Sequence, residues 1–434
     1  MFTPLTARRR PVIVPSLLAW WLVAAALPAP AQQPAAPASA ASAPAGPTMR
    51  NEVIKPLLAA QESLKGSDEA AGKAALVSVT EAEAVPALTP FETYNIQRIK
   101  AVAAFKAGDR ALALNTFETV LGSPHMPQAD KLPITEVAAK LALEANNDPA
   151  RSLRLLKAYR ELGGNDPALR RRYAALLVDR NEHAAALQEA RSAVEADEAA
   201  GRAPSELMLK VMAISYNKLN DQPAYNGVLE KLTRYYTSLD YWSELISRTA
   251  RRPGFAEERL RLDLYRLQRA VGLALETDEQ ADMALRAMQA GLPAEAQKLM
   301  DEGYAAGLFG KGAQAAAHQR LRDQATKAAA ADQKGLNENE AAARNGKDGN
   351  VAANLAMAIA ATGANERALG LLEAAIAKGG LRQPNEALLH QGMLQARLGR
   401  NDDALKTFAA VQGSDGTADL ARLWSIHLRS TAKK

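Results

Sequence analysis

Apolar residues recur at helical spacing from residue 51 to the end of the chain. They return every three or four positions, which is typical of one buried face of a helix. Short segments rich in Gly, Asn and Asp interrupt this pattern about every fifteen residues, and such segments mark turns. The predicted turns cover residues 65–68, 107–110, 179–182, 219–222, 290–293, 362–365 and 398–401, with a further turn at 345–350. The pattern predicts helix, tight turn, helix, repeated, with no strands.

The helices share an internal register. A small residue in the first helix of a pair is followed twelve residues later by an alanine, and four residues after that by a larger side chain. The clearest set is Gly392, Ala404 and Phe408. Further sets are Ala356, Ala368 and Leu372, then Ala284, Ala296 and Met300, and Ala101, Ala113 and Phe117. The last two units lie 36 residues apart, from Ala368 to Ala404.

Close packing between paired helices explains this register. Glycine inside a helix costs about 1 kcal/mol relative to alanine, so Gly392 needs a compensating contact. Small residues let two antiparallel helices approach, and we interpret Gly392, Ala404 and the equivalent alanines as repeat-packing residues. A period of 34 to 40 residues built from helix pairs is typical of a solenoid. We therefore expect an all-α fold, an α-α superhelix. The pattern is blurred at 242–280 and 310–345, where we expect irregular helix pairs.

The first 31 residues have the features of an export signal. Three arginines, Arg8 to Arg10, precede an uncharged apolar run, and Ala29-Pro30-Ala31 forms a cleavage pattern before Gln32. We expect cleavage near Ala31–Gln32, with retention as a membrane anchor as the alternative. Residues 32–50 are rich in Pro and Ala, and this composition predicts a disordered linker. The predicted solenoid then covers residues 51–434.

Charge and composition exclude several classes of function. The 434 residues contain 53 Lys and Arg, 48 Asp and Glu, and no cysteine. Loss of residues 1–31 removes three arginines and no acid, so the net charge falls from +5 to +2. A nearly neutral chain gives no argument for nucleic-acid binding. The absence of cysteine excludes disulfides, thiolate metal sites and a lipid anchor on cysteine.

No recognisable catalytic or metal-binding motif is present. No two of the five histidines, His125, His183, His318, His390 and His427, have the i,i+3 or i,i+4 spacing of a helical metal pair. "GLFGKGA" at 307–313 lacks the first glycine and the final Ser or Thr of a phosphate-binding loop. "NGKDGN" at 345–350 lacks the acidic ligands of a calcium loop. We expect no enzyme activity, no metal and no cofactor.

The repeats resemble tetratricopeptide repeats. The best matches are "LLHQGMLQARLGRNDDALKTFAAVQ" at 388–412, within a unit covering 387–414, and "ANLAMAIAATGANERALGLLEAAIAKGG" at 353–380. The mature chain also resembles proteobacterial periplasmic tetratricopeptide proteins assigned to the TonB energy-transduction system. The residues that carry this likeness are "SELMLKVMAISYNKL" at 205–219, "DYW" at 240–242, "AGLPAEAQKLMDEGYAAGLF" at 290–309, and 379–408 with Trp424. Thr237 stands where these relatives usually have proline.

The resemblance implies a candidate groove. In this family the first helix of each pair lines the concave face, and Lys210, Asn217 and Lys218 lie on such a helix. Tyr241 and Trp242 end an aromatic cluster at 234–242 that either packs at an irregular joint, which we favour, or is exposed for binding. Polar residues on such a face hold an extended peptide or a C-terminal carboxylate, and a solvated helix face is the alternative.

We expect a periplasmic, non-enzymatic scaffold that binds proteins or peptides, with TonB-motor components as partners. A second hypothesis is an envelope assembly factor that holds outer-membrane or cell-wall client proteins. A third is a helical-repeat enzyme of cell-wall processing, which needs carboxylates converging in one cleft.

Overall fold

The computed structural model describes residues 48–145, 147–236 and 238–431. The predicted signal at 1–31, most of the predicted linker, and Thr237 lie outside these residues. Within the described residues there are twenty helices, α2 to α21, and no strand. None of these helices is long and apolar enough to cross a membrane. The predicted all-α helical-repeat fold is confirmed.

The chain divides into two compact units, which we describe separately. The division passes through α10 (Glu206–Lys218): residues up to 200 and 214–219 form the first unit, and the rest forms the second. The other helices of the first unit are α2 (Asn51–Ser63), α3 (Glu69–Glu83), α4 (Pro90–Lys106), α5 (Arg110–Leu121), α6 (Gln128–Ala145), α7 (Pro149–Glu161), α8 (Pro167–Asp179) and α9 (His183–Ala199).

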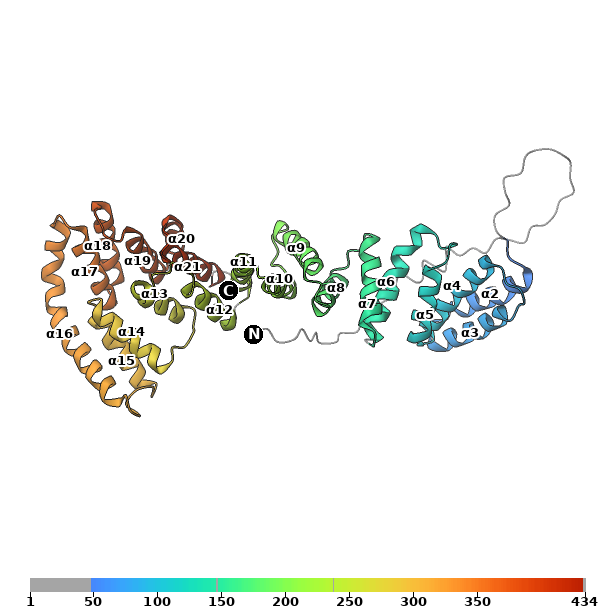
Figure 1. The fold of residues 1–434 in the computed structure, drawn as a ribbon, viewed down its shortest axis with the longest axis horizontal. Coiled ribbons are helices and arrows are strands. Elements are labelled where there is room, and N and C mark those ends of the chain that lie inside the picture. Colours follow the sequence, from blue (N-terminus) through green and yellow to red (C-terminus); the bar gives the residue numbers. More distant parts are fainter. Residues whose placement is uncertain (1–47, 146, 237, 432–434) are drawn as a thin grey trace, which may run out of the picture. The chain divides into compact units, whose positions relative to one another are not determined.

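The second unit contains the remaining helices (Figure 1). They are α11 (Gln222–Tyr235), α12 (Leu239–Ala250), α13 (Glu257–Ala270), α14 (Thr277–Gln289), α15 (Pro293–Ala305), α16 (Ala315–Asn345), α17 (Gly349–Ala361), α18 (Asn365–Lys378), α19 (Pro384–Arg397), α20 (Asn401–Ala410) and α21 (Thr417–Thr431).

Helices that follow one another in sequence pack against one another. In the first unit α2 packs on α3, α4 on α5, α6 on α7, and α8 on α9. In the second unit α14 packs on α15, α17 on α18, and α19 on α20. The two best predicted repeats coincide with the pairs α17–α18 and α19–α20. Each unit is therefore built from local helix pairs, as repeat proteins are.

The predicted turns lie between helices at all eight positions. Six of them join two helices through one residue in the left-handed conformation that ends a helix, and the turns at 65–68 and 345–350 do so without such a residue. Gly399 adopts this conformation with φ of 74° between α19 and α20. Asn220 has φ of 59° at the start of the turn before α11, and Asp221 then caps α11 by accepting from the Ala224 N–H. Asparagine tolerates this conformation better than most residues.

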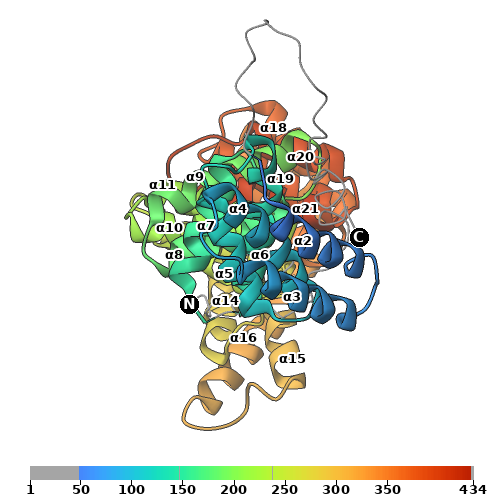
Figure 2. The same ribbon diagram turned by 90° about the vertical axis from the view of Figure 1, so that its right-hand side faces the viewer.

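Two stretches differ from a regular repeat. Residues 315–345 form one helix of 31 residues, α16, so the irregular helix pair expected at 310–345 is wrong. This helix lies beside α15 in both views (Figure 1 and Figure 2) and also contacts α17 and α18. Residues 242–280 do hold helices, but α13 packs on α12, α14 and α21. The last helix, α21, contacts α11, α13, α19 and α20.

The folded part of the chain begins slightly before the first helix. Met49 is buried, and Arg50 donates from its backbone and its side chain to the buried Glu92. Glu92 also closes the capping box of α4 with Thr89. The Arg50 guanidinium and these N–H donors lower the pKa of Glu92 to about 2, although burial opposes them. The last residues of the predicted 32–50 linker are therefore held against the first unit.

The small residues of the internal register are buried. Ala284, Ala296, Ala356, Ala368 and Ala404 have no exposed surface, and Gly392 is buried too. A Cβ atom on Gly392 would lie 2.6 Å from Cδ1 of Phe408, well inside van der Waals contact. Gly392 therefore makes room for the Phe408 ring from the partner helix. This contact fits the close-packing role that we propose for Gly392, with an aromatic ring as the group that needs the space.

We expect Gly392→Ala to destabilise the second unit by about 1–3 kcal/mol, because the methyl group overlaps Phe408. Gly370→Ala is the matched control. Gly370 lies inside α18 with nothing near its missing Cβ, so alanine there should stabilise by up to about 1 kcal/mol. Urea denaturation of both variants measures the difference. Equal effects at the two glycines would contradict the packing role, and Phe408→Leu should relieve part of the Gly392→Ala defect.

Candidate functional site

Helix α13 is surrounded by protein in the second unit. Every residue from 262 to 267 is buried, including Asp263 at 2% exposed and Arg266 at 6%. Since one face of a helix recurs only every three or four residues, six consecutive buried positions mean contacts on all sides. A buried Asp and Arg need partners, because unpaired charges are strongly disfavoured away from water.

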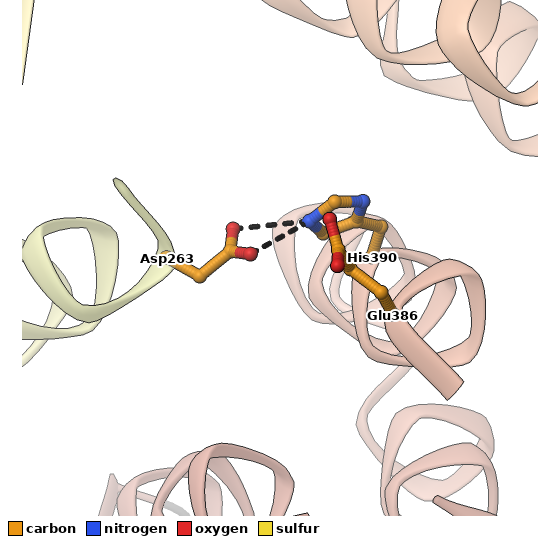
Figure 3. Close-up of side chains that lie close together, drawn as sticks. All are labelled: Asp263, Glu386 and His390. Carbon is orange, nitrogen blue, oxygen red and sulfur yellow. Dashed lines mark hydrogen bonds and ion pairs between the residues drawn. The ribbon is translucent and has the colours of Figure 1, made fainter. Parts of the chain in front are cut away.

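An ion-pair link connects α13 to two other helices. Arg266 Nη1 donates to Asp263 Oδ1 over 2.7 Å, and Arg266 Nε donates to Glu295 Oε1 of α15 over 2.9 Å. His390 Nε2 of α19 lies 3.0 and 2.9 Å from the two oxygens of Asp263 (Figure 3). We call Arg266, Asp263, Glu295 and His390 the buried link. It ties together helices far apart in sequence.

Further charged contacts surround the buried link. Arg259 of α13 pairs with Glu386 of α19 and with Asp415, which precedes α21. On the α14 side, Arg286 pairs with Glu258 at 3.0 Å and with Asp282 at 2.8 Å. Helix α13 is thus held to its neighbours by long charged side chains as well as by its leucines.

The buried link keeps its acids ionised. Burial alone raises the pKa of Asp263, but His390 and Arg266 outweigh it, so the pKa lies below its usual range. The pKa of Glu295 is lowered too. Burial raises it, but the charge and hydrogen bonds of Arg266 outweigh burial. Burial lowers the pKa of Arg266, and Glu295 and Asp263 together raise it above the usual value. The link is therefore a charged network under ordinary conditions.

Asp263, Glu386 and His390 also form a set of ligand types that metals use. One ligand atom from each lies within 4.8 Å of the others, and Glu386 and His390 share a face of α19 (Figure 3). However, Arg266 already neutralises Asp263, and Arg259 already neutralises Glu386. A divalent cation here would lie beside two guanidinium groups. We interpret the set as part of the helix-to-helix link and assign it no metal.

Two cavities flank the buried link, and Arg266 lines both. The first, which we call the Trp424 cavity, has a volume of about 610 Å³. The second, the His390 cavity, has a volume of about 460 Å³. Of the four arginines that line the His390 cavity, Arg259, Arg266 and Arg286 are in ion pairs, and Arg382 is exposed.

The Trp424 cavity contains polar groups without partners. Among the described residues, neither Lys298 nor Arg397 makes a hydrogen bond or close ion pair, and both are exposed along this cavity. The buried Trp424 indole N–H and the buried Oδ1 of Asn365 also have no partner. Two exposed cations and two buried polar atoms without a hydrogen-bond partner therefore belong to residues that line a single cavity.

Aromatic packing fixes the position of Trp424. Its ring stacks on Phe408, with centroids 6.3 Å apart and planes at 18°. His427 lies edge-on between Trp424 and Trp242, at 5.9 and 6.2 Å from their centroids. Burial lowers the pKa of His427, so this imidazole stays neutral near pH 7. The cluster joins α12, α20 and α21 at one wall of the Trp424 cavity.

The residues predicted for a binding groove differ in their surroundings. Lys210 pairs with Glu206 at 3.0 Å, and Tyr241 donates to the same Glu206 over 2.6 Å. Asn217 and Lys218 are exposed, but they belong to the first unit, whereas Lys210 belongs to the second.

Tyr241 and Trp242 are buried, so the prediction that they offer a binding surface is corrected. They pack within the second unit because aromatic rings fill the irregular joint around α12, which is the arrangement we favoured for this cluster.

The chain was compared with known proteins. No family model matches it, and no curated protein matches it.

We expect Asp263→Asn to lower the free energy of unfolding at pH 7 by about 3 kcal/mol, because it breaks a buried ion pair. Since the pKa of Asp263 is depressed in the folded state, its charge contributes stability above the unfolded pKa of about 3.9. That contribution disappears as the pH falls below this value toward the folded pKa. Urea denaturation between pH 7 and pH 3, followed by tryptophan fluorescence, measures both effects.

Asp403→Asn is the control for this prediction. Asp403 is exposed and lies 3.4 Å from Lys406, so its loss should change stability by less than about 0.5 kcal/mol. A deficit of Asp263→Asn that is absent at pH 7, or equally large at pH 3, would contradict the role of the buried link.

Proposed function

We propose that this protein is a non-enzymatic scaffold that binds other proteins or peptides. The observation that carries the proposal is the Trp424 cavity, where unpaired cations and an unpaired indole N–H line a hollow between repeat helices. Helical-repeat proteins use the surfaces between their stacked helices for recognition. A cavity with free polar groups on rigid helices suits binding, since binding requires groups that are positioned in advance.

The titratable groups at the buried link support binding over catalysis. A general acid needs a pKa raised toward the working pH, and a base needs access to a substrate proton. The pKa of Asp263 and of Glu295 is lowered instead, and both acids are bound to Arg266. These carboxylates stabilise the packing of α13.

The ion pairs of the carboxylates also weigh against the hypothesis of a cell-wall hydrolase. Glycoside hydrolysis needs two carboxylates about 5–10 Å apart, one of them protonated at the start. Asp263 and Glu386 do converge beside the His390 cavity. However, each is paired with an arginine, and the pKa of Asp263 is depressed, so neither suits the role of acid.

We place this scaffold in the periplasm, near the TonB energy-transduction system. The support is the export signal predicted at 1–31 and the likeness of residues 205–219, 290–309 and 379–408 to periplasmic tetratricopeptide proteins. The alternative is an envelope assembly factor that holds outer-membrane or cell-wall clients. The two hypotheses assign the same binding surfaces to the protein and differ only in the partner that is bound.

Crosslinking in intact cells, with capture of the tagged protein and identification of its partners by mass, tests this proposal. We expect TonB-motor components and their receptors to dominate the captured set. Unfolded outer-membrane proteins or cell-wall enzymes in their place would favour the assembly factor. Capture of no partner above the level of an exported, tagged control protein would contradict the scaffold function itself.

A further inference from the structure

We propose that the Trp424 cavity binds an acidic side chain, Glu or Asp, carried on an extended segment of a partner protein. This inference rests on the proposed scaffold function and specifies what the scaffold recognises. The argument uses the charges in the cavity, the unpaired polar atoms in its wall and the apolar side chains between them.

The cations that line this cavity favour the binding of an anionic ligand. Lys298 of α15 and Arg397 of α19 line it from different helices, and Arg266 of the buried link lines it as well. Arg269 also lines the cavity but is held by Glu302 at 2.6 Å. The one acid of the lining, Glu295, is bound to Arg266. The positive charges of Lys298 and Arg397 are thus left for a ligand.

Arg397 has no acid paired with it among the described residues. Its side chain is exposed along the cavity and makes no hydrogen bond and no close ion pair there. Neighbouring protein atoms and the charge of Arg266 lower its pKa, while the more distant charges of Glu295 and Asp263 oppose this. A carboxylate in the cavity would supply the missing counter-charge, and guanidinium groups bind carboxylates through paired hydrogen bonds.

Two buried polar atoms without a hydrogen-bond partner, in Trp424 and Asn365, indicate which further groups the ligand carries. Trp424 is only 6% exposed, and its indole N–H lacks an acceptor. A carboxylate oxygen is such an acceptor. Asn365, at the start of α18, has a buried Oδ1 that lacks a donor. The ligand therefore carries an N–H group near its carboxylate, as an acidic residue in a peptide does through its backbone.

The size and the apolar walls favour a peptide over a small inorganic anion. A volume of about 610 Å³ lies in the range of about 300–1,000 Å³ that holds ligands of several residues or drug-sized molecules. Met283, Leu299 and Met357 line it between the polar groups. Methionine side chains adapt to varied shapes, which suits peptide side chains beside the acidic one. A phosphate ion would leave these walls uncovered.

The test uses the full mature chain and three probes: the blocked peptide acetyl-Ala-Leu-Glu-Leu-Ala-amide, the same peptide with Gln in place of Glu, and free glutarate. Calorimetry measures affinity, and the indole N–H signals of the ¹⁵N-labelled protein report on Trp424. We expect the Glu peptide to bind at least tenfold more tightly than the Gln peptide at low salt and to shift one indole signal.

Four variants locate the binding. Arg397→Gln and Lys298→Gln should each weaken binding of the Glu peptide about tenfold and leave the Gln peptide unchanged. Trp424→Phe keeps the ring, removes the N–H and should weaken binding severalfold. Arg382→Gln is the matched control, because it removes an exposed cation from the His390 cavity and should change nothing. An unchanged melting temperature for Arg397→Gln shows that its effect is not unfolding.

Three results would overturn this inference. They are equal affinity for the Glu and Gln peptides, glutarate binding as tightly as the Glu peptide, and equal losses from Arg397→Gln and Arg382→Gln. The scaffold function is judged separately by capture in cells. If Arg397→Gln captures the same partners in the same amounts as the parent chain, the cavity is not their binding site, while the scaffold function stands.

Discussion

The second unit depends on the charged link between α13 and the helices around it. Placing Asp263 and Arg266 out of water costs several kcal/mol per ion unless their hydrogen bonds are satisfied. The structure satisfies them with Glu295 and His390, which come from helices α15 and α19. A rotation or slip of α13 would break this arrangement and leave buried charges unpaired. The link therefore fixes one position for α13, in which Arg266 lines both cavities.

A second chain of contacts connects the repeat pattern to the candidate site. Gly392 lacks a side chain, so the Phe408 ring lies against α19. The ring then stacks on Trp424, and Trp424 contacts His427 and lines the cavity. A residue that serves helix packing thus helps to position Trp424 in the lining of the cavity. Packing and recognition use the same side chains here, as they do in other compact binding sites.

Local physics makes the helices and turns predictable from sequence. A turn residue such as Asn220 or Gly399 acts within a few positions, and the small residues of a helix pair are twelve positions apart. Helix α16 was missed because its small, polar sequence, with Gly335 inside, reads as two short helices. In the structure it is one continuous helix, which packs on α15, α17 and α18.

The candidate site was mostly hidden in the sequence because its contacts are long-range. Asp263 and His390 are 127 residues apart, and "EERLRLDLYRLQRA" at 257–270 reads as an ordinary charged surface helix. One local signal existed: Glu386 and His390 are four residues apart and so share a helix face. The spacing of histidines alone does not reveal this pair, because its other member is a glutamate. Trp424 stood out only as a rare residue type in this chain.

The contrast between two arginines is the strongest reason to look for a ligand. Arg266 and Arg397 line the same cavity, and Arg266 is paired with Asp263 and Glu295. Arg397 is exposed along the cavity, is repelled by Arg266 and attracted by Glu295 and Asp263, and makes no hydrogen bond or close ion pair among the described residues. An exposed arginine without a close ion pair contributes little to stability, so the packing of the fold does not explain this residue. A charged group in a defined cavity that stability does not explain is typical of sites kept for function.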